Sequence, residues 1–267
     1  MTTTLDAPAA PAHRTSGQQR GDAFVGDAMA AVRDVMVRHE MTYDEYAAVK
    51  QWLIEVGEAG EWPLFLDVWF ESTVEKLATC QRKGSKGAIL GPFYLPDQVE
   101  LPTPATLPMR EDEPGEPLVL AGQVRSIDGR ALSGAVVDIW QADAAGLYGN
   151  FGLEGPPGTL RARVIADDDG RFEIHTILPA PYEIPKGGPC GQLIAAAGWS
   201  AFRPAHLHVL VTSPGHEMLT SQLYFADTDF LDNDVASAVK DELVLRQENA
   251  ADGGKRAAYD FVLAPSA

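Results

Sequence analysis

Two histidines stand one residue apart in the stretch RPAHLHV, at His206 and His208, in a chain with only six histidines. If this stretch is a β-strand, both imidazoles point to the same face of the sheet, because side chains alternate between the two faces. Two nitrogen ligands on one face can bind one metal ion. The same spacing also arises by accident on a solvent-facing strand, so the pair alone leaves both interpretations open.

The residues around the pair favour a buried position. The apolar run VLV follows His208 directly, and Arg203 and Pro204 precede the pair. The strand is therefore expected to enter a core. Two imidazoles buried beside an arginine need a chemical reason, since buried polar groups without partners are costly.

The other histidines and the carboxylates supply no convincing third ligand. His175, in FEIHTI, has the spacing of a strand face and is interpreted as structural. His13, His39 and His216 lie in the N-terminal stretch, at a helix end and in a turn. No carboxylate stands at an H-x-H-x-x-x-E offset, and no zinc site made of His and Cys is visible.

Tyrosine is the remaining ligand type. Tyr148 follows a predicted strand in the glycine-bounded loop QADAAGLYGNF, and Tyr182 lies between two prolines in PAPYEIP. Each of these tyrosines, taken alone, is more often a packing residue. Their role depends on which other side chains the fold brings to them.

The N-terminal part of the chain is predicted to be helical after a short leader. Residues 1–20 are rich in Ala, Pro, Thr and Gln and read as a disordered leader. Residues 21–85 show apolar residues at helical spacing. Thr42 and Glu45 form a capping-box signature, and Pro63 suits the first turn of a helix.

The remainder of the chain changes character twice. Residues 86–117 are rich in Pro and Gly and are predicted to form an extended connector that lines a pocket. Residues 118–267 contain several short β-rich runs with turn signals, such as Asp169-Gly170 before RFEIHTI. The predicted fold class is therefore mainly β, a C-terminal β-sandwich preceded by a helical domain.

Composition excludes several classes of protein. The formal charge of −17 makes nucleic acid an unsuitable partner, because binding it requires a basic face. No apolar run is long enough to cross a bilayer, and the N-terminus lacks the apolar core of a secretory signal. Cys80 and Cys190 are the only cysteines and form no C-x-x-C motif. A cytoplasmic protein without a disulfide framework is expected.

Four motifs now resemble one family. IWQADAAGLYGNF, PAPYEIP, RPAHLHV and TSQLYF stand in the order and character of the intradiol ring-cleaving dioxygenases. The chain looks like the catechol and chlorocatechol 1,2-dioxygenase branch, and the similarity runs from GEAGEWPLFLDVWFE to DFVLAPSA. Four motifs in the right order are a far more specific signal than H-x-H alone. The resemblance implies that the β-sandwich is the catalytic domain.

The resemblance implies a metal site. In this family one non-haem Fe(III) per subunit is bound by two tyrosinates and two neutral histidines, and the matching positions are Tyr148, Tyr182, His206 and His208. Fe(III) is a hard cation that favours anionic oxygen ligands. Tyrosine has an ordinary pKa near 10, but metal binding favours its deprotonated form. Two phenolates and one hydroxide balance three positive charges.

The resemblance also implies a reaction. A catechol loses both hydroxyl protons and binds the iron, and Tyr182 is the tyrosine that leaves the metal. Dioxygen then opens the ring between the two hydroxylated carbons and gives a cis,cis-muconate. Arg203 matches a residue that stabilises negative charge on the ring, and Gln222 matches one that holds Arg203 by a hydrogen bond. The alternative is a purely structural role, with Arg203 in an ordinary ion pair and Gln222 at a strand edge.

Further positions match residues that line the substrate cavity of the family. These apolar and small residues suit an aromatic ring with few polar groups, although several of them also suit a plain core. With Arg203, the predicted substrate-binding set is Leu64, Asp67, Val68, Ile89, Gly91, Pro92, Phe93 and Ala236. No additional basic residue is placed to pair a ring carboxylate, which argues against protocatechuate as substrate.

Two residues depart from the family pattern. Leu90 stands where catechol enzymes often carry Glu, and Ala162 replaces a common glycine in LRAR. The substitution at Leu90 is expected to affect the rim of the pocket, where chlorocatechol and hydroxyquinol enzymes also vary. Hydroxyquinol 1,2-dioxygenase is therefore the alternative activity. The metal ligands are unaffected by either change.

Two alternatives from other classes remain beside this interpretation. One is a non-catalytic β-sandwich binding module, and the other is a zinc hydrolase that uses H-x-H. Metal analysis separates the three hypotheses, because it would find iron, nothing or zinc. The resemblance further implies a homodimer formed through the helical region, with lipid bound at that interface. The apolar face of the first helices is compatible with a dimer and equally with a cover for the β-domain.

Overall fold

The computed structural model describes residues 15–149, 151–153, 155–156, 158–251 and 253–266. The chain forms two compact units, the first ending at Ile54 and the second beginning at Glu55. His13 and the first fourteen residues of the expected leader lie outside the described residues.

The first helix, α1 (Ser16–Arg38), begins earlier than predicted. The Thr15 hydroxyl accepts a hydrogen bond from the Gln18 backbone N–H at 3.2 Å, and the Gln18 side chain accepts one from the Thr15 N–H at 2.8 Å. This reciprocal capping box starts a helix within the expected leader, so the leader assignment is wrong for residues 16–20.

The second helix, α2 (Tyr43–Glu58), begins where the sequence predicted. The backbone N–H of Thr42 donates to the Glu45 carboxylate at 2.8 Å, and the Glu45 N–H donates to the Thr42 hydroxyl at 3.3 Å. Gly60, with a φ of +70°, lies just beyond the helix end. The left-handed conformation there favours glycine and stops the helix.

Among the described residues, six further short helical elements lie in the second unit. Pro63 occupies the first turn of the helix that follows α2, as predicted. That helix runs directly into a π-helical turn, which is a rare conformation often found at functional sites. The helices are α3 (Trp62–Leu66), the π-helical η1 (Asp67–Glu71), α4 (Ser72–Thr79), α5 (Pro189–Ala197), and the 3-10 turns η2 (Leu231–Asn233) and η3 (Asp241–Leu243).

The helix α5 was not predicted. It begins at Pro189, directly after a stretch rich in glycine and proline that carries no helical spacing of apolar residues. Proline is tolerated there because the first helical N–H groups have no partner within the helix. The helix ends at Gly198, whose φ is +66°.

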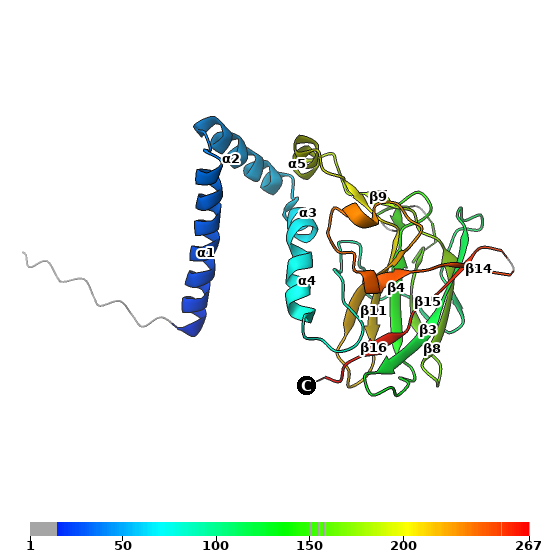
Figure 1. Cartoon of the computed structure of the whole chain (residues 1–267). Helices are drawn as coiled ribbons and strands as arrows, with labels where there is room; N and C mark the ends of the chain where they lie inside the picture. The colour runs from blue at the N-terminus through cyan, green and yellow to red at the C-terminus, as the bar shows by residue number, and fades with distance from the viewer. Residues whose placement is uncertain (1–14, 150, 154, 157, 252, 267) are drawn as a thin grey trace, which may run out of the picture. The chain divides into compact units, whose positions relative to one another are not determined.

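Two six-stranded sheets form the body of the second unit (Figure 1). The first has the order β1-β7-β4-β11-β12-β13. Its strands are β1 (Glu100–Pro102), β7 (Arg161–Ile165), β4 (Val136–Gln141), β11 (His206–Thr212), β12 (Leu219–Phe225) and β13 (Val244–Leu245).

The second sheet has the order β14-β15-β3-β8-β2, with β16 also paired to β3. Its strands are β14 (Glu248–Asn249), β15 (Lys255–Ala258), β3 (Pro117–Ser126), β8 (Arg171–Ile177), β2 (Ala105–Thr106) and β16 (Phe261–Leu263). Two small ribbons pair β9 (Tyr182–Glu183) with β10 (Phe202–Arg203), and β5 (Tyr148–Gly149) with β6 (Gly152–Leu153). The expected connector thus adds strands β1 and β2 to the sheets.

The core lies between the two sheets, and strand alternation decides which residues enter it. On β11, Leu207, Val209 and Val211 are fully buried in this core. His206 and His208 therefore point to the opposite face of the first sheet, since neighbouring residues of a strand face opposite ways. The predicted fold class, a helical region followed by a β-sandwich, is confirmed.

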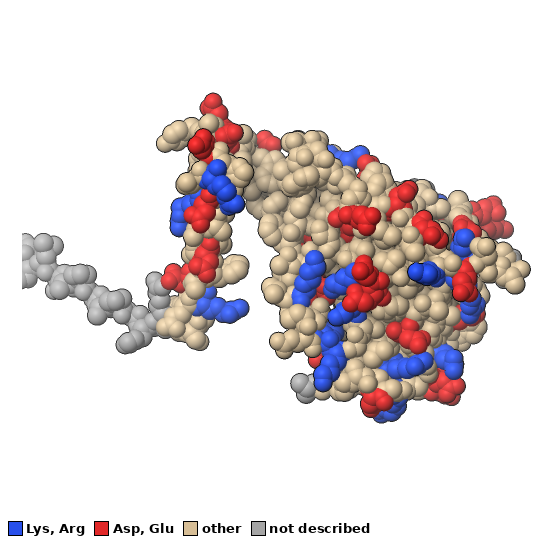
Figure 2. Space-filling view, in the orientation of Figure 1, with Lys and Arg blue, Asp and Glu red and all other residues tan. Residues whose placement is uncertain are grey.

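The second unit has a charged surface of mixed sign. Acidic and basic side chains are interspersed over the face of the second unit seen in Figure 2. Within the described ranges, no helix combines the length and apolar character that crossing a bilayer requires.

Candidate active site

The register of three antiparallel strands places a row of polar side chains on the outer face of the first sheet. His208 on β11 lies opposite Gln222 on β12 and opposite Trp140 on β4. His206 lies opposite Tyr224 by the same register. Cross-strand neighbours on one face are in contact distance, so the sheet itself positions both imidazoles and their partners.

Two short ribbons bring the tyrosines to this face. Tyr148 lies on β5, directly after the loop that leaves β4. Tyr182 on β9 is paired with Arg203 on β10, in the segment that leads into β11. The four predicted ligands thus come from β5, β9 and β11, and they converge although they are far apart in the sequence.

The four side chains form one cluster. The Nε2 atoms of His206 and His208 are 3.0 Å apart. The Tyr148 hydroxyl oxygen lies 3.2 Å from His208 Nε2 and 3.4 Å from His206 Nε2. The Tyr182 ring centroid is 5.4 Å from that of Tyr148 and 5.6 Å from that of His206. The sequence-predicted ligand set is therefore brought together.

Burial keeps both imidazoles neutral. It lowers the pKa of His206 to about 3, with a further contribution from the positive charge of Arg203. Burial also lowers the pKa of His208, and His206 and Arg203 add to that effect. The pKa values of Tyr148 and Tyr182 are raised by burial. Without a cation, the two phenols are therefore protonated.

The chemistry of this donor set fits a metal ion. His206 Nδ1 is 2.7 Å from the carbonyl oxygen of Pro204, which can only accept, so Nδ1 carries the proton. The lone pair of His206 Nε2 is thereby turned toward the cluster, as in histidines that bind metals. A trivalent cation would make the phenolates the favoured forms of Tyr148 and Tyr182. Two imidazole nitrogens and two phenolate oxygens suit hard Fe(III).

His208 is held from both sides of its ring. The indole of Trp140 stacks on it with centroids 4.9 Å apart and ring planes 9° apart. On the opposing strand, Gln222 Nε2 lies 3.2 Å from His208 Nδ1. Gly91 has a φ of +73°, and a Cβ atom there would lie 3.1 Å from His208 Cε1. Glycine therefore lets the connector approach the imidazole closely.

Arg203 is the hub of a buried hydrogen-bond network. Its Nη2 donates to Gln222 Oε1 at 2.9 Å, as the sequence analysis expected, and to the Tyr224 hydroxyl at 3.2 Å. Its Nε and Nη2 donate to the two carboxylate oxygens of Asp234, at 3.0 and 3.2 Å. Its Nη1 lies 3.3 Å from His206 Nε2. The guanidinium thus connects the ligand cluster to strand β12 and to the loop that carries Asp234.

Asp234 and Tyr224 are site residues that the sequence analysis missed. Asp234 lies in an acidic loop with several other aspartates, so nothing singles it out. Tyr224 carried a signal, because Q-x-Y in TSQLYF repeats the spacing of H-x-H on the neighbouring strand. The Tyr224 hydroxyl donates to Gln222 Oε1 at 2.6 Å and thereby helps to orient that amide.

An apolar cavity adjoins the cluster. Its lining contains every residue of the predicted substrate-binding set together with Tyr182, Ile184 and Pro185. The volume is only about 30 Å³, enough for one or two water molecules. Tyr182 belongs to the ligand cluster and also lines this cavity, so it lies between the two. An aromatic ring enters only if lining side chains move.

The two departures from the family pattern occupy different places. Leu90 packs with Trp140, Tyr148 and Tyr182, and its backbone N–H donates to the Glu71 carboxylate at 3.1 Å. Ala162 is fully buried on β7 and faces the core between the sheets. It therefore lies on the opposite face of its sheet from the ligand cluster.

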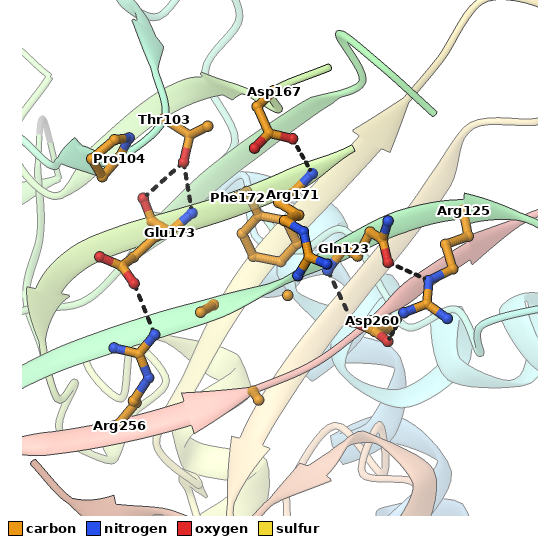
Figure 3. Close-up of a pocket in the computed structure, with 13 residues that line it drawn as sticks. Thr103, Pro104, Gln123, Arg125, Asp167, Arg171, Phe172, Glu173, Arg256 and Asp260 are labelled. Carbon is orange, nitrogen blue, oxygen red and sulfur yellow. Dashed lines mark hydrogen bonds and ion pairs between the residues drawn. The ribbon is translucent and has the colours of Figure 1, made fainter. Parts of the chain in front are cut away.

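A larger groove of about 560 Å³ lies on the second sheet (Figure 3). Its charged side chains are largely paired with each other: Arg256 contacts Glu173 at 2.8 Å and Arg125 contacts Asp260 at 3.0 Å. Phe172 belongs to this lining. The ligand cluster belongs to the other sheet, so the smaller apolar cavity beside Tyr182 is the one that adjoins it.

Known proteins resemble this chain over most of its length. Residues 18–86 match the family described as "Catechol dioxygenase N terminus", and residues 89–265 match the family described as "Dioxygenase". A chlorocatechol 1,2-dioxygenase of Rhodococcus opacus is 46% identical over 217 residues, covering 80% of this chain and 84% of that protein.

Solved structures agree with these matches. The crystal structure of 3-chlorocatechol 1,2-dioxygenase from Rhodococcus opacus 1CP has a TM-score of 0.89 and 44% identity, covering 93% of this chain and 99% of that one. The structure of hydroxyquinol 1,2-dioxygenase from Pseudomonas putida DLL-E4 has a TM-score of 0.87 and 28% identity, with 94% of each chain covered.

The chain therefore belongs to the intradiol catechol dioxygenase family. The predicted enzyme class is confirmed, and a non-catalytic binding module and a zinc hydrolase are set aside with it. Within the family, the chain falls in the chlorocatechol 1,2-dioxygenase branch.

Proposed function

We propose that the protein uses O2 to cleave catechol, or a chloro- or methyl-substituted catechol, between its two hydroxylated carbons, giving a cis,cis-muconate. The observation that carries this proposal is the buried cluster of two tyrosines and two histidines beside an apolar cavity that Arg203 also lines. The named relatives in the chlorocatechol branch support the choice of substrate class.

One Fe(III) per subunit is the proposed cofactor, held by Tyr148, Tyr182, His206 and His208. The two phenol oxygens of the donor set support this choice over zinc, which favours His and Cys ligands, whereas the neutral imidazoles suit either metal. When bound, the ion supplies a site for the two catechol oxygens and the redox chemistry toward dioxygen.

Tyr182 is proposed to take up one catechol proton at its hydroxyl oxygen. Its position between the ligand cluster and the cavity supports this role, because a substrate that enters the cavity meets Tyr182 before it meets Tyr148. Tyr148 is stacked against Phe93 with ring centroids 4.2 Å apart. That packing supports a fixed position for Tyr148 while Tyr182 moves.

Arg203 is proposed to stabilise negative charge that develops on the substrate ring. Burial alone would lower its pKa, but Asp234 and the neighbouring tyrosines raise it, so the guanidinium is charged. A fixed cation in a dry site is far more effective than one in water. Gln222 acts through Arg203 and through the orientation of His208.

A visible absorption spectrum before and after anaerobic addition of catechol tests the proposal. We expect a broad charge-transfer band from tyrosinate to Fe(III), and a shift to longer wavelength when catechol binds the metal. A protein that stays colourless after reconstitution with iron would overturn the four-ligand site. Turnover of catechol to cis,cis-muconate is then measured on the same preparation.

The cavity wall at Ala236 should set the tolerance for ring substituents. Ala236→Val is expected to lower kcat/KM for a chlorocatechol about tenfold or more relative to catechol, since it adds two methyl groups and even one methylene in a pocket changes binding by about 1–3 kcal/mol. Ala238→Val is the matched control. It makes the same change in the same loop, at a buried residue outside the cavity lining. An equal loss for both substrates in Ala236→Val would contradict the assignment.

Hydroxyquinol is the second candidate substrate. Asp67 lines the cavity, whose other lining residues are apolar apart from Arg203 and Tyr182, and burial raises the pKa of its carboxyl group. That carboxylate can accept a hydrogen bond from a third ring hydroxyl. The ratio of kcat/KM for hydroxyquinol to that for catechol decides between the two, and Asp67→Asn is expected to lower that ratio if hydroxyquinol is the substrate.

A homodimer formed through α1 and α2 is also proposed. No residue of α1 is buried, and Phe24, Val32 and Val35 are 74%, 57% and 47% exposed. An apolar groove of about 620 Å³ runs between residues of α1 and α2 and suits a lipid chain. Sedimentation equilibrium tests the dimer, and solvent extraction with mass spectrometry tests the lipid. Both cysteines are free, which suits the proposed cytoplasmic location.

A further inference from the structure

We propose that Asp234 is a positioning residue that aims the Arg203 guanidinium at the reacting centre and ties that aim to the wall of the substrate cavity. This inference rests on the proposed function, because it concerns how Arg203 meets a substrate bound there. Asp234 itself does not line the cavity, so it acts through Arg203 and through its own loop.

The Asp234 carboxylate is saturated with hydrogen bonds. Its Oδ1 accepts from Arg203 Nε and from the Ala236 backbone N–H at 3.2 Å, and its Oδ2 accepts from Arg203 Nη2 and from the Ala238 N–H at 3.0 Å. Two carboxylate oxygens offer about four acceptor positions, and all four are used. Its side chain is 2% exposed. A carboxylate fixed in this way has a single orientation.

The bidentate pair between Asp234 and Arg203 fixes the plane of the guanidinium. Two parallel hydrogen bonds to Nε and Nη2 leave Nη1 as the group directed at the ligand cluster, where it lies 3.3 Å from His206 Nε2. Bidentate pairs of this kind add geometric specificity as well as energy. Gln222 and Tyr224 contact only Nη2, so neither of them fixes Nε.

The same carboxylate holds the cavity wall. Ala236 is buried, lines the cavity and packs with Ile89 and Ala238 in one small apolar cluster. Asp234 binds the backbone N–H groups of both alanines, so a displacement of the wall displaces the carboxylate. A ring that presses on Ala236 therefore changes the direction of Arg203. Substrate fit and charge stabilisation are coupled through one side chain.

The loop also offers a matched control. Lys240, farther along the same segment, pairs with Glu75 on α4 and donates to the Gly87 carbonyl. This ion pair is half-buried, anchors the other end of the loop, and shares no partner with Arg203. Glu75→Gln thus loosens the loop without touching the guanidinium.

Steady-state kinetics of the iron-loaded enzyme with catechol test the inference. Asp234→Asn is expected to lower kcat about tenfold or more, while KM changes less than about threefold, because the misdirected charge acts on the transition state. The charge-transfer band of the resting enzyme should stay in place, since all four proposed ligands remain. Glu75→Gln should keep kcat within about twofold of the parent enzyme. Equal kinetic losses in the two variants would overturn the inference.

A double-mutant cycle separates positioning from a general structural role. If Asp234 acts through Arg203, then Asp234→Asn added to Arg203→Met causes no further loss of kcat. Losses that multiply would show that Asp234 affects turnover independently of Arg203, against the inference. Asp234→Glu keeps the buried charge pair but displaces the carboxylate by one methylene. We expect it to fold as the parent does and still to lose kcat severalfold; an unchanged kcat would also overturn the inference.

Turnover of catechol by the parent enzyme distinguishes failure of the proposed function from failure of the positioning role of Asp234. A parent enzyme that does not turn over catechol contradicts the proposed function, and the positioning role falls with it. A parent enzyme that turns over catechol, together with variants of Asp234 that keep its kcat, contradicts the positioning role alone.

Discussion

Replacing Tyr148 by phenylalanine is expected to weaken the visible charge-transfer band of the iron-loaded protein, leaving only the contribution of Tyr182, and to lower kcat for catechol by more than about 100-fold. Loss of a residue that only supports a ligand already costs about 10–100-fold, and Tyr148 is proposed as a ligand itself. The change deletes one oxygen and keeps the stacked ring against Phe93. The ring's packing, and with it the fold, should therefore persist. Metal analysis and the visible spectrum measure the result.

Tyr259→Phe is the control for this prediction. Tyr259 is half-buried, packs against Phe261 with ring centroids 5.1 Å apart and lies against the core between the two sheets. It loses the same hydroxyl group and should keep the iron, the band and the activity. Retention of the full charge-transfer band in Tyr148→Phe would show that Tyr148 is not a ligand.

Replacing Arg203 by methionine is expected to lower the free energy of unfolding by about 3–5 kcal/mol, because it leaves the Asp234 carboxylate buried without its cation. Both side chains are nearly inaccessible, at 5% and 2% exposure. Denaturant unfolding at matched iron content measures the change. Arg256→Met removes an ion pair with Glu173 whose side chains are 50% and 35% exposed. Exposed pairs contribute about 0–1 kcal/mol, so equal losses in the two variants would contradict the prediction.

The pH dependence of that loss has a definite sign. Burial alone would raise the pKa of Asp234, but Arg203 and the hydrogen bonds lower it below its ordinary value. The pair therefore stabilises the protein above the pKa of an unfolded Asp, about 3.9, and this contribution is lost as pH falls through the lower folded value. In Arg203→Met the buried carboxyl takes up a proton readily. The difference in unfolding free energy between parent and variant should shrink from pH 7 to pH 4.

Much of the ligand cluster was predictable because local rules govern it. The alternation of HLHVLV separates two imidazoles from three apolar side chains, and the sheet uses that separation directly. The Thr42–Glu45 box and Pro63 likewise act within a few residues. Roles at Tyr148 and Tyr182 came from the resemblance, since a tyrosine in a glycine- or proline-rich loop has no local signature of metal binding.

The missed parts depend on long-range pairing. Asp234 meets Arg203 across a long stretch of chain, through a loop whose path no periodicity describes. Tyr224 reaches the site only through the register of β11 with β12, which depends on the geometry of the intervening turn. The helix α5 was hidden by the glycines and prolines before it, although Pro189 is a usual first residue of a helix.

The proposed metal ligands and the cavity wall lie on different elements of the second unit, and this separation affects how substrate specificity can evolve. The proposed ligands come from β5, β9 and β11, whereas most of the cavity wall comes from α3, η1 and the segment 89–93. Mutations in the cavity wall can therefore change the specificity for ring substituents without changing metal binding. A library of variants confined to Leu64, Val68 and Ile89 should yield enzymes that share the same charge-transfer band and differ in their preference among substituted catechols.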